Sequence, residues 1–420
     1  MRGVTARRRV VRVHLSAILF GKSNLNLEAE VTEALQGIVV LDLTAYLAGP
    51  YGCALLGDVG ADIIKIEPPG GDAVRQYPSS LPDECRTFLG ANRNKRSIVL
   101  DLKNAVGLAA FYRLVEQADV VVHNFRPSVP QRLGIDYETL RSRRPDLIYC
   151  SLTGYGENEN GPLRDHPGYD TMLQCFTGLA AMQGGETGQP QILQGSIVDY
   201  HTASFVAIGI LSALVHRLRT GEGQHVKPSL LRSAIALQAG QFIWAEGEPR
   251  GVERWWGASY SGIYPTKEGH LYLQATTPAF WKNLCDALGF PELADDPRYD
   301  TLKKRAALRE QIKPLIREAL KQHTALEWEK LMLGKVPSIA VRSIEDMFDH
   351  PQLLAEGLVV EHEHPRVGKY RSMSKAVKMG VGDKPTTRAP MLGEHTDEVL
   401  ARFGFREEEI AALRAKGGAA

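Results

Sequence analysis

Residues 35 to 152 alternate short apolar runs with helix-like segments, and this alternation limits the possible folds more than any other feature. The runs that read as buried strands are residues 37–43, 61–67, 97–101, 119–123 and 147–152. Between them, Pro50 is placed to begin a helix, and residues 105–117 have helical periodicity. The pattern predicts an α/β fold with a large, doubly wound and mostly parallel sheet. Ligands are expected at the carboxyl ends of its strands.

The middle of the chain has a different character. Its apolar pattern is less regular, with a Trp255-Trp256 pair, a strand expected at 270–274 and helical patterns through 301–334. We therefore expect a large α/β domain at 35–230, a smaller α+β domain at 231–365 and a return to the large domain at 366–420. The apolar run 203–215 is too short to span a bilayer and predicts a buried core helix.

Charge and cysteine content favour an ordinary protein of a reducing compartment. Lys plus Arg number 50 and Asp plus Glu number 49, so no excess charge favours nucleic acid or a membrane surface as partner. The five cysteines are scattered and form no C-x-x-C pair. A cytoplasmic location is expected. Residues 1–34 are Arg-rich, with no acid before Glu28, and are expected to be a disordered or a targeting extension. A transit peptide would instead place the protein in the mitochondrial matrix.

Common cofactor motifs are missing. The turn after the first strand has a single glycine, Gly49, where a dinucleotide-binding loop needs three, and no phosphate-loop lysine is present. A nicotinamide-dependent dehydrogenase is therefore disfavoured. His362 and His364 share one face of a possible strand, but no third ligand lies nearby in sequence. No metal and no separate cofactor are expected.

The strongest candidate for chemistry is Asp170. It follows a loop broken by Pro167 and Gly168, and it opens an apolar segment that ends at Gly178. A carboxylate at a helix start is stabilised as an anion and could act as a covalent nucleophile. The alternative is that Asp170 only caps its own helix, since Asp is a favoured N-cap residue.

Whole motifs resemble a known family. They are Leu47-Ala48-Gly49-Pro50, Leu56-Gly57-Asp58-Val59-Gly60-Ala61-Asp62, Asn92-Arg93-Asn94-Lys95-Arg96-Ser97, Asn124-Phe125-Arg126-Pro127, Arg132-Leu133-Gly134, Thr153-Gly154-Tyr155-Gly156, Gly168-Tyr169-Asp170 and Leu392-Gly393-Glu394-His395-Thr396. In this order and spacing, across residues 35 to 404, they resemble the family III CoA-transferases. That group includes formyl-CoA and carnitine CoA-transferases and the related α-methylacyl-CoA racemases.

The resemblance implies a function, a site and an assembly. Family members are homodimers in which each ring-like chain interlocks with its partner. The family's catalytic Asp falls on Asp170, which would form a mixed anhydride and then an aspartyl-CoA thioester. Both intermediates stay activated, as an ester would not. The substrates would be an acyl-CoA and a small organic acid. Family CoA contacts fall on Tyr46, Leu47, Ala48, Leu100, Lys103, Asn124, Phe125 and Arg132, with Lys103 and Arg132 suited to the phosphates.

Departures from the family pattern bear on the substrate. Pro68 stands where the family has a CoA-contacting arginine, and Thr153 replaces a lysine. The helix after Gln224 often reads V-D-V-S-L-L-D in the family, and here it reads Val226-Lys227-Pro228-Ser229-Leu230-Leu231-Arg232. The glycine-rich lid of the formyl-CoA enzymes, expected between 245 and 265, is not present, which disfavours formyl-CoA and oxalate.

Two alternative functions remain open from the sequence. An acyl-CoA racemase on the same fold would need a His upstream of Asp170 and a Glu in the smaller domain. Residues 136–145 contain no His, and the Glu position falls on Pro265. A degenerate CoA-binding protein is the other alternative, and the intact Asp170 loop argues against it.

Overall fold

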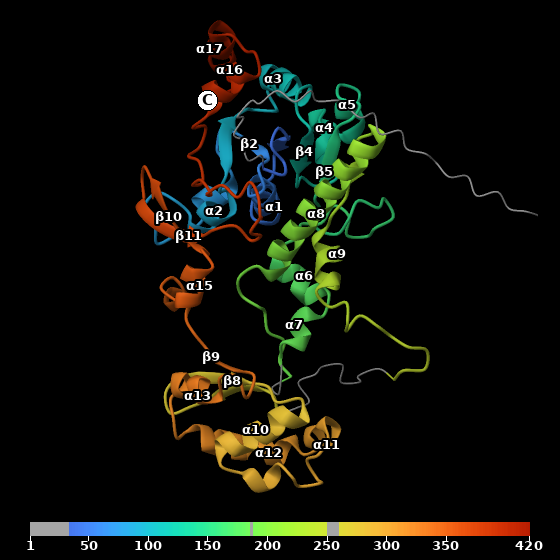
Figure 1. Ribbon diagram of the computed structural model, residues 1–420. Helices are drawn as coiled ribbons and strands as arrows, with labels where there is room; N and C mark the ends of the chain where they lie inside the picture. Colours follow the sequence, from blue (N-terminus) through green and yellow to red (C-terminus); the bar gives the residue numbers. More distant parts are fainter. Residues whose placement is uncertain (1–32, 185–187, 250–259) are drawn as a thin grey trace, which may run out of the picture.

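A computed structural model describes residues 33–184, 188–249 and 260–420, and it has two bodies (Figure 1). The larger body is built around a parallel sheet and contains the beginning and the end of the described chain. The smaller body lies apart from it. Trp255 and Trp256, which fall in the less regular middle region, lie outside the described residues.

The large sheet has six parallel strands in the order β3-β2-β1-β4-β5-β6. They are β1 (Val39–Asp42), β2 (Asp62–Glu67), β3 (Lys95–Val99), β4 (Val120–His123), β5 (Ile148–Ser151) and β6 (His225–Val226). The predicted parallel α/β sheet is confirmed. β6 was not predicted, because two residues are too few to carry a periodicity. The strand order changes direction between β1 and β4, which makes the carboxyl ends of these strands the expected ligand site.

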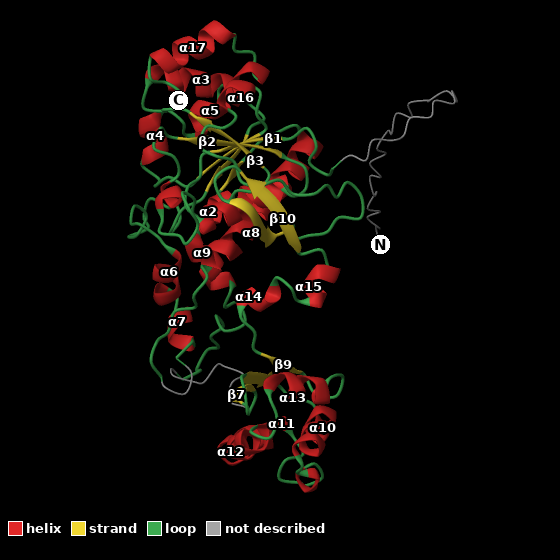
Figure 2. Ribbon diagram, turned by 90° about the vertical axis from the view of Figure 1, so that its left-hand side faces the viewer, coloured by secondary structure: helices red, strands yellow, loops and turns green. Residues whose placement is uncertain are grey.

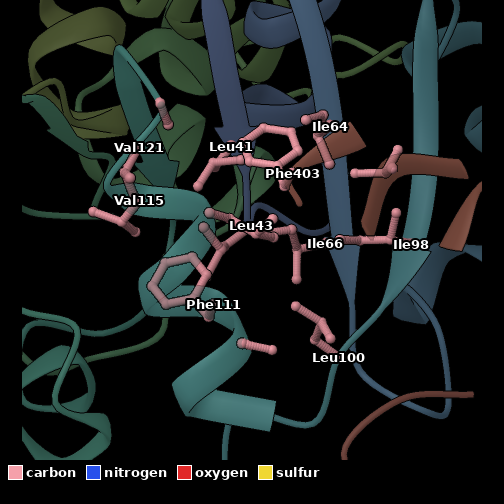
Figure 3. Close-up of a cluster of buried hydrophobic side chains, with 14 of the residues drawn as sticks. Leu41, Leu43, Ile64, Ile66, Ile98, Leu100, Phe111, Val115, Val121 and Phe403 are labelled. Carbon is pink, nitrogen blue, oxygen red and sulfur yellow. The ribbon is translucent and has the colours of Figure 1, made fainter. Parts of the chain in front are cut away.

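Helices cover both faces of this sheet. One face packs against α1 (Ala48–Gly57), α8 (Ile197–Thr220) and α9 (Leu230–Ala236). The other packs against α3 (Ala105–Val115), α5 (Tyr137–Arg141), α16 (Thr396–Arg402) and α17 (Glu407–Ala415). Figure 3 shows Phe403 from the C-terminal segment beside Leu41 of β1 in this second core, which also contains Phe111 of α3. The C-terminal segment therefore completes the large body.

Helix α8 is longer and less buried than the predicted core helix. It packs against α1, α6 (Asp170–Phe176), α9 and β5, as the core helix of a globular body does. However, Ile208, Leu211 and Val215 are 55%, 38% and 47% exposed. The prediction of a buried helix is therefore correct only for the face turned toward α1. Within the described residues, α8 is the one helix whose length and composition would also suit a membrane span.

The smaller body has its own sheet and core. Antiparallel strands β7 (Gly262–Pro265), β8 (His270–Leu273) and β9 (Ser338–Ala340) lie beside α10 (Pro278–Leu288), α11 (Leu302–Ala307), α12 (Arg309–Leu320) and α13 (Ala325–Met332). A short 3₁₀ helix, η4 (Pro291–Leu293), follows α10. Trp281 and Trp328 are buried in the core between them. The guanidinium of Arg305 is also buried, where it donates to Tyr260 Oη and to two backbone carbonyl groups.

The remaining elements connect or cover the larger body. They are η1 (Ala73–Gln76), α2 (Arg86–Ala91), α4 (Val129–Leu133), α7 (Leu179–Met182), α14 (Ile344–Met347), α15 (Pro351–Ala355) and the hairpin β10 (Val359–His364) with β11 (Gly368–Met373). Figure 2 shows the hairpin beside the larger body. Its residues Val367 and Tyr370 pack against a buried cluster that includes Phe88 of α2. Both α9 and β10 thus lie with the larger body, although they fall inside the range 231–365.

Candidate active site

A pocket of about 590 Å³ opens at the carboxyl ends of β1, β4 and β5, where the strand order changes direction. Its wall comes from the loop after β1, the loop and helix α4 after β4, the loop after β5 and the loop that leads to α6. Asp199 and Leu230 complete the lining.

Most of the residues expected to contact CoA meet at this pocket. Those that line it are Tyr46, Leu47, Ala48, Asn124, Phe125 and Arg132. Leu100 and Lys103 do not. Leu100 follows β3, two strands away from β1, and is buried in the core with its backbone paired to Ala419. Lys103 lies exposed on the loop between β3 and α3.

The loop after β1 is held in an uncommon conformation. Tyr46 has a φ of +69°, which is unfavourable for a bulky residue and needs support from its surroundings. Asp72 Oδ1 accepts the Tyr46 N–H at 3.2 Å. The amide of Asn124 accepts the Ala45 N–H at 3.0 Å and donates to the Ala45 carbonyl at 2.6 Å. Asn124 therefore braces the loop that forms the pocket wall.

Buried charges lie beneath this loop. Lys65 Nζ donates to Asp72 Oδ2 at 3.0 Å and to the Thr44 carbonyl at 2.9 Å. Lys95 Nζ donates to Asp42 Oδ2 at 2.8 Å. Burial opposes the charge of Lys65, but the Asp42 and Asp72 carboxylates outweigh burial and raise the pKa of Lys65. The Tyr46 backbone is thus tied through Asp72 to an ion pair inside the sheet.

Asp170 is the first residue of α6, and its carboxylate points to a different helix. Its Oδ2 accepts the N–H of Val198 at 2.6 Å and of Asp199 at 3.2 Å, both in the first turn of α8. Its Oδ1 accepts from Gln174 Nε2 at 2.5 Å. The N-cap of α6 is Tyr169, so the alternative reading of Asp170 as the cap of its own helix is wrong. The three donors hold the Asp170 carboxylate in a fixed position against the first turn of α8.

Two glycines allow the Asp170 loop to reach this place. A Cβ on Gly168 would lie 2.6 Å from the Cα of Gly154, and a Cβ on Gly154 would lie 2.9 Å from the Cα of Gly168. Real side chains do not approach a backbone so closely. The loop after β5 and the loop before α6 therefore cross only because both residues are glycine.

Two residues of the site were missed from the sequence. Gln174 lies one turn after Asp170 on α6, and a Gln inside an apolar helix gives no signal of this role. Asp199 lines the pocket from the first turn of α8. Burial, with the charge of Asp170 adding to it, raises the pKa of Asp199 to about 7. Its position 29 residues after Asp170 gives no hint of their proximity.

The pocket wall is rich in guanidinium groups, namely those of Arg126, Arg132 and Arg164, and it also contains His166. Arg164 pairs with Asp165 at 3.0 Å. Within the described part of the chain, the guanidinium groups of Arg126 and Arg132 have no ion-pair partner. Free guanidinium groups beside a pocket suit phosphate oxygens. Thr153 also lines the pocket, whereas Pro68 does not.

The two histidines of the hairpin lie elsewhere. His362 and His364 are on β10, outside this pocket. Across residues 33–184, 188–249 and 260–420, no three His, Cys, Asp or Glu side chains are grouped as metal ligands would be.

The chain is similar to known proteins over most of its length. The sequence matches CoA-transferase family III over residues 35–396. It is 33% identical to succinyl-CoA:glutarate CoA-transferase of Mus musculus, over 93% of this chain and 91% of that protein. It is 36% identical to succinate–glutarate CoA-transferase of Agrobacterium fabrum, over 88% of this chain and 95% of that protein.

Solved structures also resemble this chain. A crystal structure of a CAIB/BAIF family protein from Brucella suis superposes with a TM-score of 0.75 at 29% identity, covering 89% of this chain and all of that one (100%). The matched region contains the six-stranded sheet, the pocket and Asp170. The chain belongs to CoA-transferase family III and is an enzyme that transfers CoA.

Proposed function

We propose that this enzyme moves CoA from an acyl-CoA donor, such as succinyl-CoA, to a small carboxylic acid through covalent intermediates on Asp170. The observation that carries the proposal is the Asp170 carboxylate, held by backbone donors at the start of α8 beside the pocket. Positioned donors keep the nucleophile aligned, and the covalent route needs no metal or separate cofactor.

The chemistry balances without any net proton transfer. A carboxylate oxygen of Asp170 attacks the thioester carbonyl. The C–S bond breaks, CoA departs as its thiolate, and an acyl-aspartyl anhydride remains on the enzyme. The thiolate then attacks the aspartyl carbonyl and releases the donor acid as its carboxylate. The acceptor carboxylate attacks the resulting aspartyl-CoA thioester, which expels CoA thiolate again and forms a second anhydride. The thiolate then attacks the acceptor's carbonyl in this anhydride. The products are a new acyl-CoA and free Asp170.

The proposed CoA position follows the lining of the pocket. Tyr46, Leu47 and Ala48 would lie along the pantetheine arm, and Arg132 would meet a phosphate. Arg126 is a further phosphate ligand and could replace the cation that Pro68 does not supply. Leu100 and Lys103 lie beyond the pocket at the end of β3, so a contact with CoA would come from its distal nucleotide end.

The names of the relatives guide the acid panel. Two relatives are named for succinyl and glutaryl substrates, and four-carbon and five-carbon dicarboxylates are therefore the first acids to test.

An interlocked homodimer is part of the proposal as well. Its support is the exposed apolar face of α8, formed by Ile208, Leu211, Val215 and Leu218. Light scattering behind size exclusion should give twice the mass of the chain.

One experiment tests the activity and separates it from its main alternative. Purified enzyme is incubated with succinyl-CoA and a panel of carboxylic acids, and the acyl-CoA products are identified by mass spectrometry. Transfer that depends on the acid is expected. In a second assay, the enzyme is incubated with a 2-methylacyl-CoA in deuterated water. The α-position of this thioester should stay unlabelled. Rapid α-deuteration without CoA transfer would instead establish a racemase.

A further inference from the structure

Two carboxyl groups with opposite surroundings share the active site. Asp170 is 6% exposed and accepts three hydrogen bonds, from Gln174 and from the first turn of α8. Asp199 is half-buried on the pocket wall, and its own backbone N–H is one of those three donors. Among the described residues, no side chain or backbone group donates a hydrogen bond to the Asp199 carboxyl group, and no cation pairs with it.

No element around Asp199 supplies an opposite charge or a hydrogen-bond donor to its carboxyl group within the described residues. Asp170 on α6 brings a like charge, and Tyr77 after η1 and Tyr200 on α8 interact with it electrostatically without donating to it. Tyr46 and Tyr169 form an edge-to-face pair on the same wall. The pocket lining also includes the guanidinium groups of Arg126, Arg132 and Arg164 and the imidazole of His166, and none of them is ion-paired with Asp199. Two like charges in one partly buried site favour ionisation of only one of them.

We propose that Asp199 acts in the transfer reaction as a neutral carboxylic acid, which donates a hydrogen bond to the acid substrate as that substrate approaches Asp170. This inference rests on the proposed function and assigns a substrate-contacting residue to the same site. Asp199 makes and breaks no covalent bond in this role, and its proton stays on its own oxygen.

The role answers an electrostatic difficulty of the reaction. Donor and acceptor acids enter and leave as carboxylates, and they meet Asp170 while it carries CoA or an acyl group. An ionised Asp199 on the wall would repel each acid. A protonated Asp199 removes that charge and supplies a donor to an oxygen that is anionic in the substrate carboxylate. The raised pKa of Asp199, about 7, is consistent with this role near neutral pH.

The test compares two substitutions across pH 6 to 9, a range in which substrate carboxyl groups stay ionised. In the wild type, kcat/KM for the acid should fall as pH rises through about 7, because Asp199 loses its proton. Asp199→Asn keeps a neutral donor and should remove this alkaline fall while retaining transfer. Asp199→Ala has no donor, so it should raise KM for the acid roughly tenfold to a hundredfold, with no fall near pH 7.

Asp165→Asn is the matched control. Asp165 lines the same pocket, but its carboxylate is paired with Arg164, so this variant should keep the alkaline fall whatever its rate. If Asp199→Asn keeps the wild-type pH profile and KM for the acid, the assignment is wrong, while CoA transfer still stands. If the wild type transfers no CoA to any acid, the proposed function itself fails. Circular dichroism and the unfolding temperature verify that each variant folds.

Discussion

Gln174 Nε2 donates to Asp170 Oδ1 at 2.5 Å from one turn further along α6. The same amide donates to the Leu193 carbonyl at 2.9 Å, and its Oε1 accepts the Leu193 N–H at 2.9 Å. Gln174 therefore fixes the nucleophile and also ties α6 to the segment that leads into α8. One buried amide links the two sides of the site, so changes at Gln174 should affect catalysis more than CoA binding.

Gln174→Ala should lower kcat by about tenfold to a hundredfold, the effect of losing one hydrogen bond to a charged group of about 1.5–3 kcal/mol. Stopped-time assays of acyl-CoA formation measure it, with the Kd for CoA followed in parallel. Gln191→Ala is the control, because Gln191 lies exposed in the same connecting segment. A larger effect on CoA affinity than on kcat would contradict the positioning role.

Arg132→Gln should weaken CoA binding by about 1.5–3 kcal/mol, because a guanidinium–phosphate contact is a charge-assisted hydrogen bond. Isothermal titration with CoA, and with analogues lacking individual phosphates, identifies the phosphate involved. The loss should disappear for the analogue that lacks it. Arg141→Gln on the exposed end of α5 is the control. An equal loss with a short N-acetylcysteamine thioester would place Arg132 away from the phosphates.

Asp72→Ala should destabilise the fold by about 3–5 kcal/mol, because it leaves the buried charge of Lys65 without its partner. It also frees the Tyr46 N–H, so CoA affinity should fall in the folded fraction. Urea unfolding measures the stability. The double variant Lys65→Met with Asp72→Leu removes both charges and should lose less stability than Asp72→Ala alone. A double variant that loses as much stability as Asp72→Ala, or more, would show that the two side chains are not coupled.

Acidification should destabilise the protein through two histidines of the large sheet, His123 on β4 and His225 on β6. Burial lowers the pKa of His123 to about 3 and that of His225 to about 4, so both stay neutral in the folded state. In the unfolded chain each takes up a proton below about pH 6.5. The unfolding free energy should therefore fall between pH 6.5 and 4, by up to about 1.4 kcal/mol per pH unit for each histidine.

His225→Gln is the variant that tests this pH dependence. It should make the fall in unfolding free energy less steep than in the wild type, since one proton-binding group is removed. His270→Gln is a suitable control, because His270 lies exposed at the start of β8. Identical slopes for His225→Gln and the wild type would contradict the assignment.

The sequence predicted the large sheet well because its information is local. Each of β1 to β5 is a short apolar run followed by a turn or a helix signal, and that pattern is enough for a parallel α/β sheet. The local pattern predicted neither the two-residue strand β6 nor the exposed face of α8. Burial of a helix face depends on which neighbours the chain brings to it, and no periodicity encodes that.

The site was predictable only where a motif or a strand end marked it. Asp170 and the pocket loops at Tyr46 and Asn124 follow from such signals. The hydrogen bond from α8 to the Asp170 carboxylate does not follow from any such signal. Its donor, Val198, lies 28 residues further on and contributes only its backbone N–H. Asp199 was missed for the same reason, since its role depends on the distance to Asp170 in space.

The most direct test of the account is to find the covalent intermediate on Asp170. Enzyme is incubated with succinyl-CoA without an acceptor, treated with borohydride or hydroxylamine, digested, and mapped by mass spectrometry. The account predicts modification at Asp170 alone, no modification in Asp170→Ala, and no transfer by that folded variant. An Asp170→Ala enzyme that transfers CoA at the wild-type rate would contradict it.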